Sequence, residues 1–447
     1  MNQNQFIMKK ILLLLVLIMS LLATAQAGFI IRGINTSVFP DNLKNFTLTL
    51  NNDEPVSAGS MYTTDGGGEG RNSIVIIPAD TNVSATYFPF TFGIDEEFNF
   101  EVRDFHYDVT NNLYVLCGSR ENGFEAFAFV AKINIVTSTM DYNEYPDADI
   151  FYSLSTPNDH KTDYYVCGKS GNYGTIASIN KSTLYLTNLF ITDYEWVCHK
   201  IIEKPSNAID PQFVVSGRNP ECTAVGYTAI DPSFASGVTS FWDQLSELDA
   251  HCVVCEDATN NNNIILATSY QNRVTVNTVF FSSTPQLYVH HYSFAPNTNF
   301  YIQDIGMTDI QGASNSLISL AGYMTDGTSP QHQAWYGSKS SLYFTSQIRS
   351  KIYYQEDGLY EHYKIRYDQY GVVYTGGFFQ GDNSMCALFG YPQQISDHCD
   401  IDDESIYVAR EPVYWLSLAL PEQFSLPQTP IQSEQQDIEM PVFIECE

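Results

Sequence analysis

Residues 113–134 read LYVLCGSRENGFEAFAFVAKIN, and this segment contains the unit from which the chain is built. An apolar run ends in a small residue and Gly118, a polar loop follows, and a second apolar run rich in Phe, Ala and Val ends the segment. Two β-prone runs separated by a short polar loop that contains glycine predict a β-hairpin. Because the same arrangement returns along the chain, the hairpin is one member of an internal repeat.

Six other segments have this form, and they begin at Val56, Tyr164, Phe213, Ile264, Leu317 and Val372. The glycine that ends the first run marks each copy. In chain order the markers are Gly59, Gly118, Gly168, Gly217, Thr268 in place of glycine, Gly322 and Gly376. The successive gaps are therefore 59, 50, 49, 51, 54 and 54 residues. Seven copies at so regular a spacing indicate one repeating structural unit.

Each copy extends to roughly four short strands. A weaker β-prone run precedes most copies, as at residues 102–108, and another follows, as at residues 140–145. Runs rich in Val, Ile, Tyr, Phe and Thr between turn residues predict an all-β chain, in which the one short helix expected lies near residues 236–248. Four-stranded units at this period are typical of propeller blades, which bury their faces by stacking.

We therefore predict an all-β fold, a single seven-bladed β-propeller of four-stranded antiparallel blades, over residues 45–420. A six-bladed or open arrangement is the alternative. Ring closure requires a strand from one terminus to complete the blade begun by the other. Residues 28–44, which contain GFIIRGIN, and residues 406–420 are both candidates, and we expect joint closure. Residues 421–447 are rich in Gln, Pro and Glu and predict a C-terminal tail.

The first 27 residues predict export. Lys9 and Lys10 precede an apolar run over residues 11–22, which is shorter than the roughly 20 residues that span a bilayer. Ala25-Gln26-Ala27 places small residues at the cleavage positions. We expect residues 1–27 to be a cleaved signal peptide, no membrane span, and a secreted, periplasmic or cell-surface location. An uncleaved anchor is the alternative.

Composition argues against several function classes. The chain has 51 Asp+Glu against 21 Lys+Arg, a formal net charge of -30, so a nucleic-acid partner is not expected.

Nine cysteines are too sparse for a disulfide framework. Cys252 and Cys255 have a C-x2-C spacing, but a strand points residues three apart to opposite faces. We therefore expect buried thiols and no metal there.

The second copy resembles the bacterial β-propeller repeat family, whose repeats share a Tyr-Val-x-Gly strand and an Ala-Phe-Val-Ala-Lys-Ile/Leu strand. The second strand matches at residues 128–133, and the first matches at Tyr114, Val115 and Gly118, with one residue more between Val and Gly. The Gly376-Gly377 doublet is loosely similar to kelch repeats, although the tryptophan of those blades is not in place. The resemblance implies a fold and a secreted, often surface, setting, and it brings no catalytic residues.

In propellers that resemble this chain, the loops between the second and third strands of each blade open on the usual binding face. Those loops carry Arg71, Arg120, Lys169, Arg218 and Arg273, each from a different blade, and Tyr173. Converging cations predict a site for a carboxylate or sulfate, and the tyrosine ring suits a sugar. The alternative is neutralisation by acids of the linking segments. These acids are Asp95, Glu96, Glu97, Asp147, Asp149, Asp193, Glu195, Glu247 and Asp249.

The expected inner strands hold two further candidate sets. The four histidines His106, His199, His251 and His362 would suit a transition metal, but they do not fall at one depth, so we expect satisfied or solvated side chains. Asp104 and Asp304 are candidates for glycoside hydrolysis, which requires paired carboxylates.

The sequence as a whole favours a binding or scaffold module that recognises a protein or glycan through one face of the ring, without a cofactor. Two alternatives stay open: a carbohydrate-active enzyme that uses channel carboxylates, and a purely structural envelope protein. The sequence contains no Gly-x-Ser-x-Gly elbow, no His-Glu-x-x-His, no P-loop and no Asp-x-Asp-x-Asp-Gly calcium loop. Those absences count only against those enzyme classes.

Overall fold

The computed structural model describes residues 29–34, 44–64, 70–78, 90–93, 99–121, 125–137, 139–155, 161–203, 213–220, 224–230, 237–243, 251–257, 263–280, 286–294, 297–308, 316–326, 331–340, 348–353, 359–368, 371–381, 384–390, 401–404, 406–407, 414–418, 434–437 and 442–446. The predicted signal peptide, residues 1–27, lies outside these ranges. Within them, no helix has the length and apolar character needed to cross a membrane.

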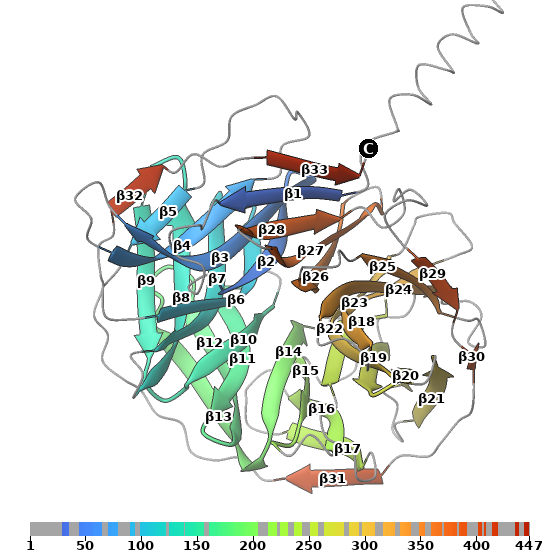
Figure 1. The fold of residues 1–447 in the computed structure, drawn as a ribbon. Helices are drawn as coiled ribbons and strands as arrows, with labels where there is room; N and C mark the ends of the chain where they lie inside the picture. Colours follow the sequence, from blue (N-terminus) through green and yellow to red (C-terminus); the bar gives the residue numbers. More distant parts are fainter. Residues whose placement is uncertain are drawn as a thin grey trace, which may run out of the picture.

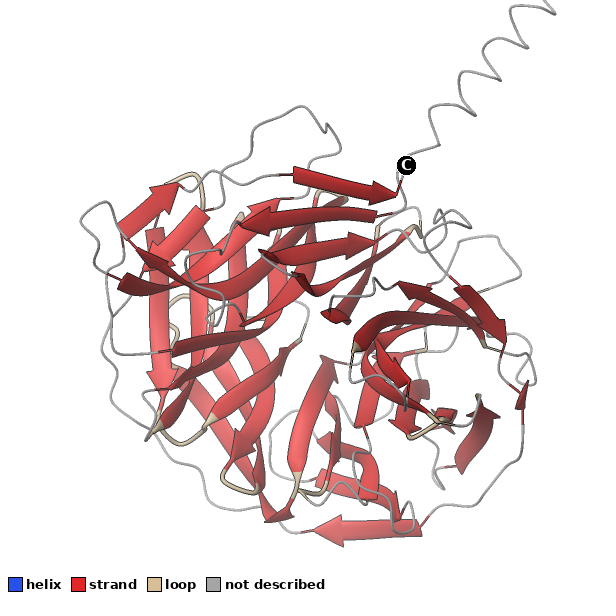
Figure 2. Cartoon of the chain, in the orientation of Figure 1, coloured by secondary structure: helices blue, strands red, loops and turns tan. Residues whose placement is uncertain are grey.

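The described strands form seven antiparallel sheets, which we number in chain order (Figures 1 and 2). Sheet 1 contains β2 (Lys44–Asn51), β3 (Glu54–Thr64), β4 (Gly70–Pro78) and β5 (Phe90–Gly93). Sheet 2 contains β6 (Asn99–Asp108), β7 (Leu113–Glu121), β8 (Ala126–Asn134) and β9 (Thr139–Tyr145). Sheet 3 contains β10 (Ile150–Leu154), β11 (Asp163–Ser170), β12 (Tyr173–Asn180) and β13 (Leu186–Glu195). Sheet 4 contains β14 (Val197–Glu203), β15 (Phe213–Arg218), β16 (Ala224–Ile230) and β17 (Gly237–Asp243).

The remaining sheets follow the same plan. Sheet 5 contains β18 (His251–Glu256), β19 (Asn263–Tyr270), β20 (Arg273–Phe280) and β21 (Gln286–Ser293). Sheet 6 contains β22 (Thr298–Thr308), β23 (Leu317–Asp326), β24 (His332–Ser340) and β25 (Arg349–Tyr353). Sheet 7 contains β26 (Leu359–Tyr367), β27 (Val373–Gly381), β28 (Ser384–Gly390) and the N-terminal β1 (Phe29–Ile34). The prediction of an all-β chain of antiparallel sheets is confirmed for the described residues.

Two sequence-based expectations are wrong. The helix expected near residues 236–248 is not formed over residues 237–243, the part of that segment that the structure describes. These residues form strand β17, which is rich in β-branched and aromatic residues and pairs with β16 along its whole length. The share in ring closure expected of residues 406–420 is also wrong. β1 alone takes the place beside β28, from Phe29 opposite Gly390 to Ile34 opposite Met385. Residues 406–407 and 414–418 pair with β21 and β17 instead.

Residues 401–446 add a fifth strand to five of the sheets, and we call these the outer strands. They are β29 (Ile401–Glu404) on β25, β30 (Ile406–Tyr407) on β21, β31 (Tyr414–Leu418) on β17, β32 (Glu434–Asp437) on β5 and β33 (Val442–Cys446) on β1. They lie around the outside of the sheets in Figure 1. Two of them come from residues 421–447, which the sequence describes as a tail. Each satisfies backbone groups that an edge strand would otherwise leave unpaired.

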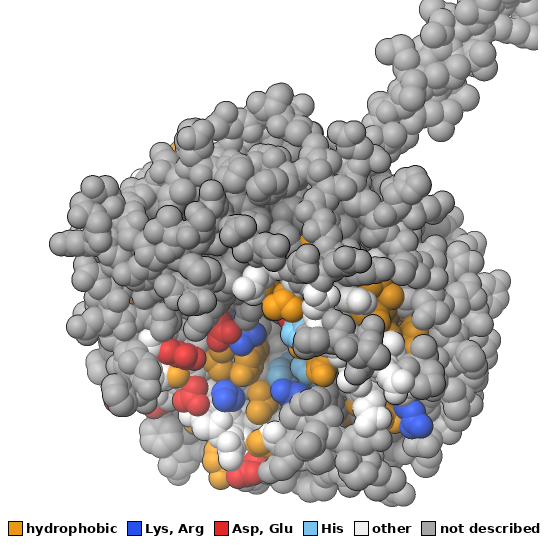
Figure 3. Space-filling view, viewed as in Figure 1, with side chains coloured by type: hydrophobic (Ala, Val, Ile, Leu, Met, Phe, Trp, Pro, Cys, Tyr) orange, Lys and Arg blue, Asp and Glu red, His pale blue; other side chains and the backbone are white. Residues whose placement is uncertain are grey.

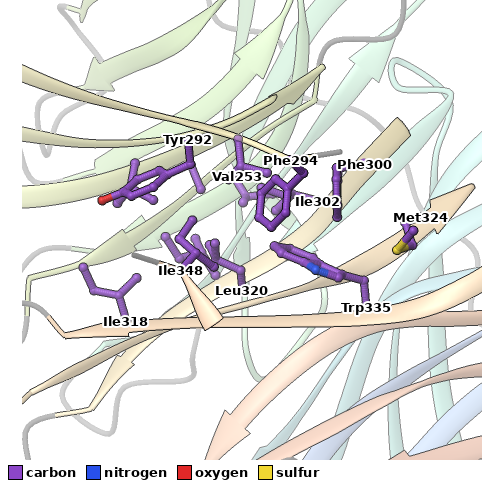
Figure 4. Packing of buried hydrophobic residues seen from close by; sticks show 14 of the residues in the cluster. Val253, Tyr292, Phe294, Phe300, Ile302, Ile318, Leu320, Met324, Trp335 and Ile348 are labelled. Carbon is purple, nitrogen blue, oxygen red and sulfur yellow. The ribbon is translucent and has the colours of Figure 1, made fainter. Parts of the chain in front are cut away.

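The hydrophobic core lies between successive sheets. Separate clusters join sheets 1 and 2, 2 and 3, 3 and 4, 4 and 5, 5 and 6, and 6 and 7. Figure 4 shows the cluster between sheets 5 and 6, where the ring of Trp335 meets Phe300 with centroids 5.1 Å apart. Each large apolar side chain buried in this way contributes about 1.5–3 kcal/mol. Stacking of neighbouring sheets therefore supplies most of the stabilisation.

The first strand of each sheet is innermost. Each of these seven strands, β2, β6, β10, β14, β18, β22 and β26, contacts the next, and β26 contacts β2. In five of them one extra residue interrupts the ladder just after the residue opposite the repeat glycine, which is a β-bulge. A sixth inner strand, β2, also has one extra residue, between Lys44 and Thr47. The glycines are Gly118, Gly168, Gly217, Gly322 and, in the last copy, Gly377 rather than the predicted Gly376.

The bulge explains the glycine. At Gly118 an added Cβ would lie 1.8 Å from the carbonyl oxygen of Glu101 on the inner strand. The same close carbonyl approach occurs at Gly168 and Gly377. In sheet 5, where Thr268 replaces glycine, β18 pairs with β19 without a register shift. The repeat therefore needs glycine at this position because the bulged inner strand brings a backbone carbonyl too close for a side chain.

Candidate functional site

A cavity of about 60 Å³, which we call the central cavity, lies between the inner strands and is lined by residues from all seven of them. The lining residues are Phe46, Thr47, Val102, Arg103, Tyr152, His199, His251, Cys252, Val253, Ile302, Gln303, Tyr363 and Lys364. Typical small-molecule pockets hold about 300–1,000 Å³. The central cavity therefore has room for a few water molecules or for one functional group of a larger ligand.

The bulges point particular side chains toward this cavity. The five extra residues are Arg103, Tyr152, His199, Gln303 and Tyr363, and every one of them lines the cavity. A bulge commonly reorients a side chain beside a functional site. Thus the feature that requires a glycine on the second strand also selects the residue that faces the centre.

Half-buried aromatic rings form a row along the cavity, and we call this row the aromatic arc. Its members are Tyr152, His199, His251, Tyr301, Tyr323 and His332. Successive ring centroids are 5.4, 6.5, 5.5, 4.7 and 4.4 Å apart. Figure 3 shows histidine, basic and hydrophobic side chains gathered in a hollow on one face of the molecule. The arc spans sheets 3 to 6.

A charged group stands at each end of the arc. At one end the guanidinium of Arg103 lies 5.4 Å from the centre of the Tyr152 ring and 2.5 Å from a carboxylate oxygen of Glu101. At the other end Nδ1 of His332 bonds to Glu361, which also accepts a hydrogen bond from the hydroxyl of Tyr363. The rings are therefore fixed from both sides.

Three rings of the arc, those of Tyr152, His199 and His251, are uncharged at neutral pH. Burial, with Arg218, His251, Arg103 and Lys169 nearby, holds the pKa of His199 well below its usual value. Burial and Arg218 lower the pKa of His251 to about 3. Burial raises the pKa of Tyr152. Two polar atoms here, Nε2 of His199 and Nε of Arg103, are buried without a hydrogen-bond partner among the described residues.

The four inner-strand histidines are not brought together. Only His199 and His251 have their rings in contact, while His106 lies 3.7 Å from Asp104. His362 precedes a bulge on β26, and burial lowers its pKa to about 3. In the part of the chain that the structure describes, no group of three His, Cys, Asp or Glu residues could hold a metal ion.

A buried ion network fills the centre beside the central cavity, and it contains Asp104, His106, Lys200, Asp304, Lys364 and Arg366. Arg366 joins the two acids, since it lies 3.2 Å from Asp104 and 3.4 Å from Asp304. Nζ of Lys364 lies 3.0 Å from Asp104, and Lys200 pairs with Asp304. The network thereby connects sheets 2, 4, 6 and 7.

These contacts decide the chemistry of the two carboxylates. Burial acts to raise the pKa of Asp104, but Lys364, His106 and Arg366 outweigh it and hold the pKa well below the usual value. Burial also acts to raise the pKa of Asp304, but Lys200, Lys364 and Arg366 outweigh it, so this pKa is lowered as well. A glycosidase needs one carboxyl with a raised pKa as its general acid. Neither Asp104 nor Asp304 fits that role.

The structure separates the cations expected on the loops. Arg120 is buried and pairs with Glu144, to which Tyr142 also donates a hydrogen bond. Arg273 is exposed and donates to the hydroxyl of Tyr270 over 2.8 Å. Both therefore have partners within the chain. The partner of Arg120 is an acid outside the expected set, and that of Arg273 is a tyrosine hydroxyl, so neither contact is the neutralisation by linking-segment acids that the alternative describes.

The other loop candidates are placed differently. Lys169 lies one residue before the end of β11, and Arg218 ends β15. Both are half-buried and lie close enough to lower the pKa of His199. Tyr173 begins β12 and is 43% exposed. Arg71 lies on β4 opposite Thr63, and its side chain is outside what the structure describes. Only Lys169 and Arg218 are thus brought to the arc.

Sequence reasoning missed most of the arc, although a signal was present. The inner strands contain the four-residue segments VRDF, FYSL, CHKI, IQDI and HYKI at residues 102–105, 151–154, 198–201, 302–305 and 362–365. The second position is the bulged residue, and the third supplies Asp104, Ser153, Lys200, Asp304 and Lys364. Ser153 joins the ion network by donating to Asp104 over 3.0 Å. Aligning these segments therefore reveals both the residues that line the cavity and the residues that form the ion network.

The prediction that Cys252 and Cys255 are buried thiols is confirmed. Cys252 packs in the cluster between sheets 4 and 5, and Cys255 packs in the cluster between sheets 5 and 6. They therefore point to opposite faces of β18. Cys117, Cys167 and Cys198 are also buried.

No protein-family model and no curated protein sequence matches the chain. Among solved structures, it is similar to the Dos1 propeller, with 9% identity and a TM-score of 0.38 over 80% of this chain and 97% of the other. It is also similar to Chaetomium thermophilum Sqt1 bound to the N-terminus of ribosomal protein L10, with 8% identity and a TM-score of 0.40 over 78% and 98%. A third is the Pseudomonas aeruginosa periplasmic gluconolactonase PpgL, with 9% identity and a TM-score of 0.36 over 87% and 98%.

The seven described sheets, whose inner strands contact one another in turn, form a propeller-like fold. Membership of the bacterial repeat family, the kelch likeness and export stay predictions.

Proposed function

We propose that the chain is a closed seven-bladed propeller, exported by residues 1–27, that acts as a binding or scaffold module and recognises a protein or glycan ligand at the aromatic arc. One observation carries this proposal: residues from all seven inner strands line a single cavity. The contact between β26 and β2 and the place of β1 in sheet 7 support closure.

The chemistry of the arc supports a binding role. Its rings are half-buried, which leaves part of each open to a partner. Tyrosine and arginine are the side chains most often found at the energetic centre of binding interfaces, because they combine apolar area with hydrogen-bonding groups. Arg103, Tyr152 and Arg218 bring those residue types to one place.

The carbohydrate-active alternative loses its support in the ion network. Asp104 and Asp304 have cationic partners on both sides and backbone donors from Leu154 and Ile365 at 2.9 Å. Carboxylates held this firmly in the ionised form stabilise the fold and do not act as general acids. A purely structural envelope role remains the competing proposal, and a binding measurement separates it from ours.

The experiment is a glycan and peptide binding screen of the chain from Gly28 onward. We expect at least one ligand whose affinity falls more than tenfold in Tyr152→Ala and in Arg218→Ala. Arg273→Ala is the matched control, because its guanidinium is exposed and bonds to Tyr270, and Tyr185→Ala controls for an exposed ring between β12 and β13. A chain that binds only ligands insensitive to both arc variants, or no ligand, would overturn the proposal.

A further inference from the structure

The central cavity is poor in acids in a strongly acidic chain. Among its described lining residues are two cations, two histidines and two tyrosines, and no Asp or Glu. Chance would favour acids, since the chain has 51 of them against 21 Lys and Arg. The lining therefore offers hydrogen-bond donors, and the group that fits it is an acceptor.

Two donors at this place are unused within the described residues. Nε of Arg103 always carries a proton, and Nε2 of His199 carries one in one of the two neutral tautomers. The two residues come from β6 and β14, and Tyr152 from β10 contacts both, with its ring 5.4 Å from each. Burying a donor without a partner costs about 1–3 kcal/mol. A ligand oxygen that bonds to both would recover that free energy.

The charge and volume limit what that ligand group is. Arg103 already pairs with Glu101, and the ion network that contains Lys364 has three cations, Lys200, Lys364 and Arg366, against the two carboxylates of Asp104 and Asp304, so about one positive charge is left uncompensated. This favours a singly charged group over a dianionic phosphate. A cavity of about 60 Å³ accepts one carboxylate but not the ring that bears it.

The aromatic arc is suited to the remainder of the ligand. Its rings present flat apolar faces with polar edges, which is the surface against which the C–H face of a sugar ring packs. Tyr152, His199 and His251 belong both to the arc and to the cavity lining. A ligand there would contact both at once.

Resting on the binding function proposed above, we propose that this site takes a uronic acid residue of an acidic glycan, with the carboxylate in the central cavity beside Arg103 and His199 and the sugar ring against Tyr152. A peptide C-terminus has the carboxylate without the ring. A neutral glycan has the ring without the carboxylate. The two-part site favours the ligand that has both.

The test compares three probes on the chain from Gly28 onward by calorimetry: trigalacturonate, its methyl ester, and a neutral galactose trisaccharide. We expect trigalacturonate to bind at least tenfold more tightly than either of the other two. Equal affinity for the acid and the ester would overturn the proposal, and this comparison needs no variant.

Variants then locate the contact. Arg103→Gln should remove the preference for the acid over the ester, while Arg273→Gln should leave it unchanged. Tyr152→Ala should weaken all sugar binding, and Tyr152→Phe should retain most of it because the ring remains. A preference that survives Arg103→Gln would place the carboxylate elsewhere and contradict the inference.

The outcomes separate this inference from the function on which it rests. Binding of a neutral glycan or a peptide at least as tightly as trigalacturonate, and lost in Tyr152→Ala, would disprove the uronic acid inference and keep the binding module. Binding that no arc variant affects would disprove both.

Discussion

Gly118 is one of three repeat glycines at which an added side chain would meet a backbone carbonyl oxygen most closely. A Cβ there would lie 1.8 Å from the carbonyl oxygen of Glu101 and 3.1 Å from the ring of Phe129. The oxygen belongs to the backbone of a bulged inner strand, so it cannot rotate away. We predict that Gly118→Ala lowers the free energy of unfolding by about 3 kcal/mol or more, measured by urea denaturation.

The control for that variant is Gly171→Ala, in the turn between β11 and β12. Gly171 has a φ of 57° and no atom within 4 Å of the added Cβ. Its cost is therefore the backbone conformation alone, about 1–2 kcal/mol. Equal losses in the two variants would mean that the carbonyl approach at Gly118 is not what requires the glycine.

At the scale of the strand, the sequence predicts correctly those features that depend on residues close together in the chain. The glycine spacing revealed the repeat because each marker lies within its own hairpin. The bulges were not foreseen, because a bulge is defined by the register between two strands and not by either strand's composition. Arg120 shows the same limit, since its partner Glu144 lies two strands away on β9.

The outer strands were also not foreseen. β32 reads EQQD, which has little β propensity, and it forms a strand beside β5. Pairing with an existing edge can override such weak propensity. Composition alone therefore described residues 421–447 as a tail, and the structure pairs part of them with sheets 1 and 7.

The outer strands lead to the second prediction. β33 pairs with β1, the strand that completes sheet 7, through Phe29, Ile31 and Arg32. Deleting residues 438–447 removes this pairing, and with about 1 kcal/mol net for each lost hydrogen bond we expect a loss on the order of 2–3 kcal/mol. The exposed edge of β1 should also promote association, which light scattering would detect.

Deleting residues 401–447 is the companion measurement, since it uncovers the edges of five sheets. We expect a larger loss of stability than for the shorter deletion. An unchanged unfolding midpoint in both truncated chains would show that the outer strands contribute nothing to the fold.

At the scale of the whole molecule, buried histidines should control the response to acid. Burial lowers the pKa of His106, His199, His251 and His362. In the unfolded chain a histidine titrates near 6.5. Between that value and the lowered pKa, the unfolded state binds protons that the folded state does not, so stability falls as the pH falls.

The carboxylates of the ion network act in a lower range. The pKa values of Asp104 and Asp304 lie below their usual value in the folded state. Their contribution is therefore fully present above a pH of about 4 and is lost only as the pH falls through the lowered folded values. Loss of stability between pH 6.5 and pH 4 then belongs to the histidines.

The third prediction uses this separation. We expect the free energy of unfolding to fall by about 1 kcal/mol per pH unit for each such histidine below pH 6.5. His251→Gln should reduce that slope by one proton's share, because the pKa of His251 is about 3. Protonation of the many acids relieves their mutual repulsion and raises stability as the pH falls, but it does so equally in the unmodified chain and in His251→Gln. The difference between the two slopes therefore isolates the histidine. Parallel slopes in urea titrations at pH 7.5, 6, 5 and 4.5 would contradict the prediction.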